Sequence, residues 1–343
     1  MKVFGLSARK PFPTKVTVDL NTQCNAKCII CPYPEISASL KHGRMEWGLY
    51  KRIIDDYAAI CLSNGIMGEL SYCNMSEPTL LPDFPEFVKY AREKGVFTIY
   101  FNSNGSNLGP ALVDRFIKDR TYPAVHLNIM AFSEGRYREV MGLDFSRLRE
   151  NLGYLLKKYP HKLIDIGFFT PLMTGDEIGA VKEFFRGTKV KLHLAEGISD
   201  RASNVTLPEG LRATQHEQGR RLVACGKNRP IHRMHVNYDG RVYLCDQDMR
   251  LETDFGNVSV STIEEVWNGK AMTDALDALY GRSAASGAEL PCLRCEDAVY
   301  DGAARIHDSP SDFRPRRLFG PLKRWAVRKG YCVVMKRGKI SFP

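Results

Sequence analysis

The chain of 343 residues is 44% hydrophobic and carries a formal net charge of +10. These values are typical of an ordinary folded protein with one large domain and a smaller one, and they exclude a chain too short to bury a core. No run of about eighteen apolar residues and no signal-peptide pattern occurs, so the sequence predicts neither a membrane span nor secretion, and we expect the protein in the cytoplasm.

The basic residues are spread along the chain, with a denser cluster after Arg314. A basic surface can attract nucleic acid, anionic lipid, a phosphorylated substrate or an acidic electron donor, although a solvated surface is the better explanation for most such residues. No helix-turn-helix, zinc-finger or aromatic RNA-binding motif occurs, so we expect no nucleic-acid partner.

Strand and helix patterns alternate from residue 15 to about residue 195, which is typical of βα units around a parallel sheet. The predicted strands are residues 15–20, 69–72, 96–101, 124–129, 163–168 and 189–194. The clearest helix starts at Asp83, its expected N-cap, and ends at Gly95. Six units are fewer than the eight of a closed barrel, so the predicted fold is α/β, an open, partial (β/α)6 barrel with its active site at the C-terminal ends of the strands.

The alternation stops after about residue 205. Residues 232–237 and 241–244 predict a β-hairpin whose two-residue turn is Asp239-Gly240. Ser261 and Glu264 have the spacing of a capping box at the start of a following helix. We therefore predict a barrel over residues 1–205, a small hairpin-plus-helix domain over residues 206–300 and a basic tail over residues 301–343.

Three cysteines, Cys24, Cys28 and Cys31, follow the first predicted strand directly. In a reducing compartment, spaced cysteines indicate metal ligands sooner than disulfides. A [4Fe-4S] cluster held by three thiolates keeps one iron open for a chelating amino acid, such as the methionine end of S-adenosylmethionine (SAM). A zinc site without its fourth ligand and cysteines that pack as small hydrophobes are the alternatives.

The C-x3-C-x2-C spacing resembles the signature of the radical SAM superfamily. Met75-Ser76-Glu77-Pro78 follows the second strand where this family usually has Gly-Gly-Glu-Pro, and Asn102-Ser103-Asn104-Gly105 follows the third where relatives often have Thr-Asn-Gly. Met75 and Ser76 depart from the family's glycines, which puts close approach of the backbone to SAM in doubt. The resemblance implies that SAM contacts Ile30, Ser76, Glu77, Ser103, Asn104 and Asn128.

A second group consists of Cys225, Cys245, Cys292 and Cys295. Four thiols saturate a metal site, and from the spacing alone a structural zinc is a serious alternative. The run from Cys225 to Cys295 resembles the auxiliary-cluster domain called SPASM, in its shorter four-cysteine or twitch-like form. The resemblance implies one auxiliary [4Fe-4S] cluster here, and hence two clusters in the chain.

The resemblance also implies the reaction class: reductive cleavage of SAM to a 5′-deoxyadenosyl radical that abstracts hydrogen from a small polar substrate. An oxidoreductase follows if the auxiliary cluster accepts an electron, as in the aminocyclitol dehydrogenase whose cysteine layout this chain resembles. An epimerase follows if a thiol returns hydrogen, and Cys73 is the candidate donor, with a buried core cysteine as the alternative. Asp246 and Asp248, with His193 and Glu196, are candidates for substrate binding or proton transfer.

Other readings concern substrate and partners. A ribosomally made peptide is the alternative substrate. Enzymes of this family that modify such peptides often carry a leader-binding domain ahead of the cysteine loop, and only twenty-three residues precede Cys24 here. We therefore expect a small molecule, sugar-like or phosphorylated. A non-enzymatic iron-sulfur protein is a further alternative. Flavodoxin or ferredoxin is the expected reductant. Docking of the basic tail to an anionic membrane is a further hypothesis, but we expect its apolar residues to pack on the barrel instead.

Overall fold

The predicted α/β fold is confirmed by a computed structural model that describes residues 9–72, 74–209, 211, 221–282, 290–301, 334–336 and 339–341. An eight-stranded sheet has the order β6-β5-β4-β3-β2-β1-β8-β9, in which β1 to β6 are parallel and follow one another in sequence. These six strands are β1 (Lys15–Val18), β2 (Glu69–Tyr72), β3 (Thr98–Ser103), β4 (Ala124–Ile129), β5 (Ile164–Phe169) and β6 (Lys191–Ala195). They form the expected partial barrel.

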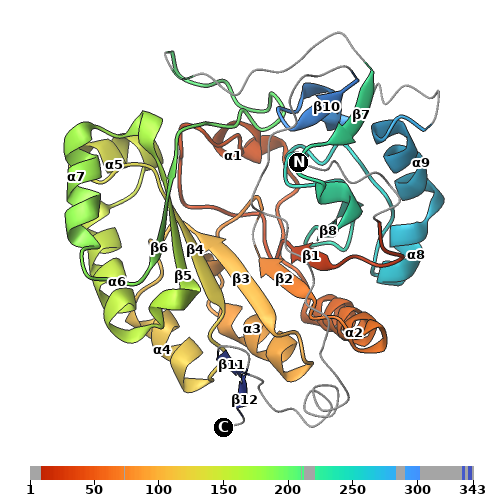
Figure 1. The fold of residues 1–343 in the computed structure, drawn as a ribbon, viewed down its shortest axis with the longest axis horizontal. Coiled ribbons are helices and arrows are strands. Elements are labelled where there is room, and N and C mark those ends of the chain that lie inside the picture. Colours follow the sequence, from red (N-terminus) through yellow and green to blue (C-terminus); the bar gives the residue numbers. More distant parts are fainter. Residues whose placement is uncertain are drawn as a thin grey trace.

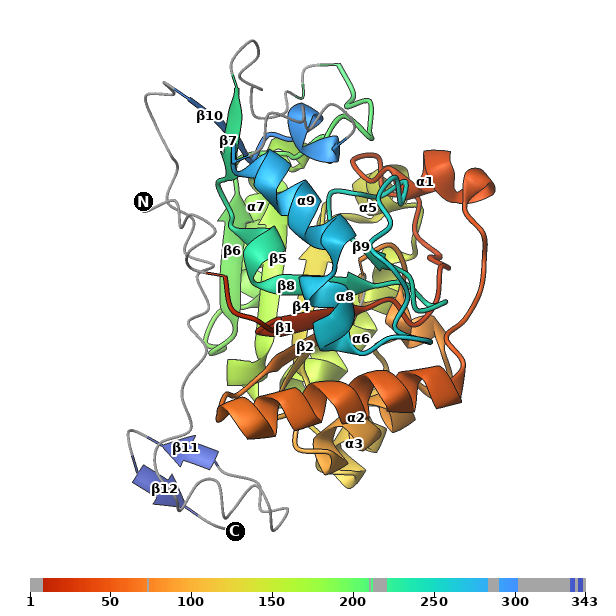
Figure 2. The ribbon, with the colours of Figure 1, turned by 90° about the vertical axis from the view of Figure 1, so that its right-hand side faces the viewer.

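Helices cover the outer side of the curved sheet (Figure 1). The α-helices are α1 (Tyr33–Ile36), α2 (Trp47–Asn64), α3 (Phe84–Glu93), α4 (Pro110–Lys118), α5 (Glu134–Met141), α6 (Phe145–Lys158), α7 (Gly175–Phe184), α8 (Ile263–Asn268) and α9 (Lys270–Leu279). Short 3-10 helices are η2 (Ser37–Ser39), η3 (Pro78–Leu80), η4 (His161–Leu163), η5 (Thr170–Leu172), η6 (Arg229–Ile231) and η7 (Pro291–Arg294). Figure 2 shows α8 and α9 in front of β1 and β8, on the side of the molecule away from α5 to α7.

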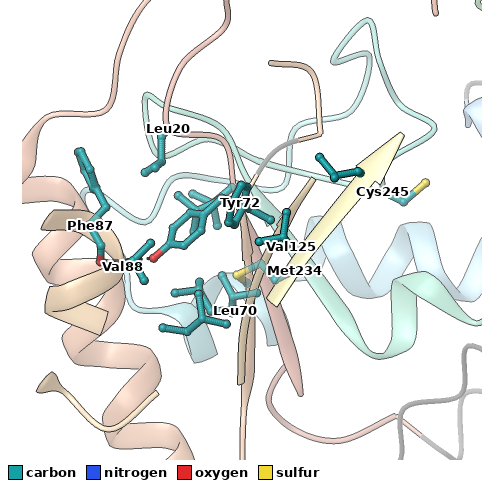
Figure 3. Packing of buried hydrophobic residues seen from close by; sticks show 14 of the residues in the cluster. Leu20, Leu70, Tyr72, Phe87, Val88, Val125, Met234 and Cys245 are labelled. Carbon is teal, nitrogen blue, oxygen red and sulfur yellow. Dashed lines mark hydrogen bonds between the residues drawn. The ribbon is translucent and has the colours of Figure 1, made fainter. Parts of the chain in front are cut away.

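The barrel strands separate apolar from polar side chains. Successive residues of a strand point to opposite faces, so an alternating sequence gives one apolar and one polar face. In β1, Val16 and Val18 belong to the hydrophobic core, whereas Lys15 and Thr17 face the barrel interior. Figure 3 shows core side chains from several of these strands packed together, with Tyr72 of β2 pointing toward α3. The polar face of the strands is therefore the inner one.

The predicted hairpin is present, and it extends the barrel sheet. Its first strand, β8 (Arg233–Val236), pairs in parallel with β1 so that Arg233 lies opposite Lys15. Its second strand, β9 (Val242–Tyr243), pairs antiparallel with β8. The C-terminal segment thus adds polar side chains to the wall of the barrel interior. The domain boundaries at residues 205 and 300 stay predictions.

The hairpin turn differs from the expected two-residue turn. The Asn237 N–H donates to the Arg241 carbonyl at 2.9 Å, which leaves the three residues 238–240 as the loop. Of the two predicted turn residues only Gly240 has a positive φ, of 87°. This is the arrangement of a three-residue loop whose last residue is left-handed. A dipeptide that favours turns does not by itself determine the loop length.

One predicted helix start is corrected and another is confirmed in position. The capping box of α8 consists of Thr262 and Glu265, one residue later than predicted. Asp83 does occupy the N-cap of α3 but makes no capping hydrogen bond, because its carboxylate pairs with Arg44 instead. Gly95 has the positive φ expected of a residue that ends a helix, 90°.

Beyond the barrel, β7 (Leu222–Cys225) and β10 (Ala298–Tyr300) form a small antiparallel sheet. Near the C-terminus, β11 (Val334–Lys336) and β12 (Lys339–Ser341) form another antiparallel pair. The rest of the predicted basic tail, from residue 302, lies outside the described residues. Among the residues that are described, no helix combines the length and apolar character needed to cross a membrane.

We expect a measurable loss of stability in Tyr57→Phe. The buried Tyr57 hydroxyl donates to the Thr14 carbonyl at 2.8 Å and accepts from the Glu69 N–H at 2.9 Å, which joins α2 to β1 and β2. Removing it leaves buried backbone groups without this partner, so the free energy of unfolding should fall by about 1–3 kcal/mol in anaerobic urea titrations. The control is Tyr154→Phe, whose surface hydroxyl bonds Asp114. Equal losses in both variants would contradict this role of Tyr57.

Candidate active site

One cavity of about 350 Å³ lies inside the barrel. It is lined by all nine residues predicted to hold the first cluster and SAM: Cys24, Cys28, Cys31, Ile30, Ser76, Glu77, Ser103, Asn104 and Asn128. Asp246, from the loop after β9, lines the same cavity. Residues far apart in the sequence are thus brought to one site, at the edge of the sheet where the βα loops gather.

The loop that carries the first three cysteines is held by backbone hydrogen bonds. The Lys27 N–H donates to the Met141 carbonyl at 2.8 Å, at the end of α5. The Cys24 N–H donates to the Tyr33 hydroxyl at 3.1 Å. Anchored on both sides, the loop presents its three half-buried thiols to the cavity.

The three thiols are poorly suited to exist as free thiolates. Burial raises the pKa of Cys24 to about 11, and it also raises the pKa values of Cys28 and Cys31. The negative charges that Cys24 and Cys31 would carry raise the pKa of Cys28 further. A cationic metal cluster would remove this penalty, because thiolates bind metals as anions. The donor set therefore fits a cluster held by three cysteines.

Glu77 joins the loops that follow β2 and β3. Its carboxylate is 2% exposed and accepts hydrogen bonds from the Thr79 hydroxyl at 2.6 Å, the Ser103 hydroxyl at 3.0 Å and the Asn104 N–H at 2.8 Å. The Asn104 side chain in turn donates to Asn25 of the cysteine loop at 2.9 Å. Burial raises the pKa of Glu77, and these donors oppose that shift. Glu77 thus connects the three segments expected to contact SAM.

The second cysteine group is also brought together. Cys225, Cys245, Cys292 and Cys295 line one small apolar cavity. The pairing of β7 with β10 places Cys225 opposite Ala298. The N–H groups of Gln247 and Asp297 donate to the sulfurs of Cys245 and Cys295, each at 3.4 Å. Four thiols with backbone donors to their sulfurs fit a closed, four-cysteine cluster site.

A buried ion pair stands between the two cavities. The Arg229 Nε lies 3.1 Å from Asp246 Oδ1, and its Nη1 lies 2.6 Å from Asp297 Oδ2. Burial by itself raises the pKa of Asp246, but Arg229 outweighs this effect and holds the pKa well below its usual range. Because Cys245 lines the small cavity and Asp246 the large one, the two cavities share a wall at consecutive residues.

Asp248 has a different environment from Asp246. It is 1% exposed, and it accepts hydrogen bonds from the Glu252 N–H at 2.8 Å and from the Thr253 N–H at 3.1 Å and hydroxyl at 2.5 Å. It is not among the residues that line the large cavity. Its carboxylate shapes the loop between Asp248 and Thr253.

The remaining candidates are not brought to the cavity by the described structure. His193 Nε2 lies 2.6 Å from Asp165 Oδ1, and neither residue is among those lining the cavity. Glu196 is exposed. Cys73 lies outside the described residues, between Tyr72 and Asn74.

Several cavity residues were missed by the sequence reasoning. They are Lys15, His126, Arg201, Arg233 and His235. The signal was present in part, because the alternation of β1 and β8 marks the polar face that carries Lys15 and His235. The alternation alone does not place these residues in a cavity, because the polar face of an alternating strand is normally expected to face solvent.

Two family models match the sequence. The radical SAM superfamily matches residues 19–186, and an iron-sulfur cluster-binding domain named SPASM matches residues 225–296. The chain belongs to the radical SAM superfamily. Its C-terminal segment is a SPASM domain, so the resemblance noted from the cysteine spacing is confirmed.

Solved structures support this radical SAM fold. SuiB of Streptococcus suis bound to its precursor peptide SuiA is 15% identical with a TM-score of 0.60, and the match covers 84% of this chain and 70% of that one. The structure of anSMEcpe with bound AdoMet is 16% identical with a TM-score of 0.54, and the match covers 78% of this chain and 81% of that one. The structure of BtrN with AdoMet and 2-DOIA is 17% identical with a TM-score of 0.50, and the match covers 83% of this chain and 98% of that one. At this identity the likeness concerns the fold alone. No curated protein matches the sequence significantly.

The cofactors of this radical SAM enzyme are SAM and iron-sulfur clusters, as its two domains imply. The match to an iron-sulfur domain favours a cluster over the zinc alternative at Cys225, Cys245, Cys292 and Cys295. Among the described residues, no three cysteine, histidine or acidic side chains lie close enough to hold a single metal ion. We assign the first cysteine group to the SAM-binding cluster and the second to the auxiliary cluster as a proposal.

The pH dependence of stability should report on Asp19, at the edge of this site. Its buried carboxylate accepts from the Asn74 N–H at 2.8 Å and the Tyr243 hydroxyl at 2.6 Å, and burial raises its pKa to about 6. A raised pKa means that the folded state binds a proton more readily than the unfolded chain, so this group's contribution to stability falls as the pH rises through about 4 to 6.

We therefore expect the free energy of unfolding of wild type, relative to that of Asp19→Asn, to rise by about 1 kcal/mol when the pH is lowered from 7 to 5. Anaerobic urea titrations of both proteins at the two pH values measure this difference, and the other titrating groups cancel between them. A difference that does not change with pH would contradict the raised pKa of Asp19.

Proposed function

We propose that this enzyme dehydrogenates a small polar substrate of carbohydrate or aminocyclitol type. When bound, SAM on the first cluster supplies a 5′-deoxyadenosyl radical that takes a hydrogen atom, and the auxiliary cluster supplies an electron acceptor. The observation that carries the proposal is the shared wall at Cys245 and Asp246 between the two cavities. A substrate held against Asp246 would lie beside the second cysteine group.

The cavity supplies polar groups suited to substrate hydroxyl or amine groups. Beside the expected SAM contacts, Tyr100, Asn102 and His126 of β3 and β4 line the cavity. Ligand sites of this kind fix a small molecule through a few convergent polar groups. Their number in the barrel interior favours a substrate with several hydrogen-bonding substituents.

Asp246 is the proposed acceptor of the substrate's proton. Oxidation of an alcohol to a carbonyl releases a hydrogen atom, a proton and an electron, so a base must stand at the hydroxyl. Asp246 lines the cavity, and its ion pair with Arg229 fixes the direction of the carboxylate and keeps it ionised, while the lowered pKa makes it a weak base. Asp248, whose oxygens are occupied by Glu252 and Thr253, is less suited to this role.

Epimerisation is the competing outcome, and it requires a thiol beside the substrate. Cys61 belongs to α2, is 6% exposed and is not among the residues lining the cavity. The other described cysteines belong to the two cluster groups. The epimerase hypothesis therefore depends on Cys73 or Cys332, which both lie outside the described residues, and dehydrogenation has the more direct support.

A peptide substrate is the second candidate, because SuiB is solved with its precursor peptide SuiA whereas BtrN is solved with 2-DOIA. The fold likeness does not choose between them. The cavity favours the small molecule, since it continues inward to Lys15 at the start of β1. An acidic reductant such as flavodoxin or ferredoxin suits the net charge of +10.

Iron content and 5′-deoxyadenosine formation test the cluster assignment. We expect about eight irons per chain in anaerobically reconstituted wild type and about four in either Cys24→Ala/Cys28→Ala/Cys31→Ala or Cys292→Ala/Cys295→Ala. Only the first variant should lose 5′-deoxyadenosine formation, because the auxiliary cluster does not bind SAM.

The matched control is Cys61→Ala, which removes a buried cysteine outside both groups and should keep about eight irons. Wild type with about four irons and one zinc would contradict the auxiliary cluster, and with it the dehydrogenase. Deoxyadenosine formed by the first triple variant would contradict the assignment of the SAM-binding cluster.

A further inference from the structure

The inner end of the large cavity is built from β1 and β8. Lys15 and His235 line it together with Arg233, which lies opposite Lys15 in the strand pairing. Lys15 begins β1 and Val18 ends it, so this inner end lies roughly 10 Å below the end of the strand, at about 3.3 Å per residue. The cysteine loop follows the other end of β1, so this floor is separate from the expected SAM contacts.

Arg233 makes no direct ion pair with a described carboxylate, although Asp246 is near enough to interact with it electrostatically. Its guanidinium lines the cavity, yet no hydrogen bond or ion pair joins it to any other described side chain. Arg229, four residues earlier, is paired with both Asp246 and Asp297, whereas the half-buried Arg233 has no such pair. A guanidinium presents up to five donors in a fixed fork, and an oxyanion is the group that matches it.

His235 provides a second and independent indication of a ligand. The side chain is 2% exposed and lines the cavity, and neither ring nitrogen has a hydrogen-bond partner. Buried polar groups in folded proteins are nearly always hydrogen-bonded, because leaving them unpaired costs free energy. Burial lowers the pKa of His235 to about 3, so the ring is neutral and offers one donor and one acceptor.

The acidic groups nearby are already occupied. Glu69 pairs with Lys15 at 3.0 Å, and Lys15 also lies over the Tyr100 ring at 4.2 Å. Asp246 is held by Arg229, and Glu77 by its own donors. Asp246 interacts electrostatically with Arg233 and His235, but its direct ion pair is with Arg229, so the hydrogen-bond donors of Arg233 stay available to a ligand.

We propose that Arg233 and His235, with Lys15 beside them, bind an acidic substituent of the substrate, a carboxylate or a phosphate. The proposal rests on the proposed function, because it names the class of that substrate. An acidic group anchored at this floor would orient the rest of the molecule toward the cysteine loop. The substrate is then an acidic or phosphorylated polar molecule, and the floor selects it against its uncharged counterpart.

Anion-dependent thermal stability tests this site without turnover. The sample is reconstituted protein with SAM, and the probes are inorganic phosphate and malonate at about 10 mM, which is about ten times an expected dissociation constant of about 1 mM. Potassium chloride at the same ionic strength is the reference. We expect at least one anion to raise the Tm of wild type by ~3 °C and to leave that of Arg233→Gln unchanged. A shift with phosphate alone indicates a phosphoryl group, and one with malonate alone indicates a carboxylate.

The control is Arg186→Gln, which removes an exposed arginine paired with Glu183 outside the cavity and should keep the full shift. His235→Asn should reduce the shift, and it carries the same test if Arg233→Gln does not fold. The proposal is overturned if neither anion stabilises wild type or if Arg233→Gln and His235→Asn respond as wild type does. A protein that shows the shift but forms no 5′-deoxyadenosine would instead contradict the proposed function.

Discussion

The buried carboxylate of Glu77 holds the site together. It accepts hydrogen bonds from Thr79, Ser103 and Asn104, and Asn104 continues the connection to Asn25 inside the first cysteine loop. A buried carboxylate is costly unless donors surround it, so the loops after β2 and β3 must stay where they can supply those donors. The same requirement therefore positions the cysteine loop and the segments expected to contact SAM.

The interior of the barrel follows from the alternation of its strands. Their apolar residues pack against the helices, which leaves the polar residues to face inward. Most of the charges there are balanced, as in the pairs of Lys15 with Glu69 and of Arg229 with Asp246. On the floor, Arg233 makes no direct ion pair and the His235 ring nitrogens make no hydrogen bond among the described residues. We therefore propose that one end of the cavity holds the cofactor and the other an acidic group.

Local patterns in the sequence predicted much of the framework. The limits of β2 and β4 agree with the predicted ones, and those of the other barrel strands differ by one or two residues. The length of the hairpin loop and the position of the helix cap differed from the prediction. A turn at Gly240 and a cap near Thr262 depend on hydrogen bonds that neighbouring residues can satisfy equally well. Asp246 and Asp248 look alike in sequence, yet one lines the cavity and the other stabilises a loop.

The sequence by itself determined the class of enzyme, and it indicated two cysteine groups, because the first group has the short spacing typical of the family and the second lies within the matched SPASM domain. Only the tertiary structure decided that β8 pairs with β1, that Cys245 and Asp246 separate two cavities, and that Arg233 lines the larger one. The physical reason is that these features depend on contacts between residues up to about two hundred positions apart, and a pattern read along one strand carries no information about the strand beside it.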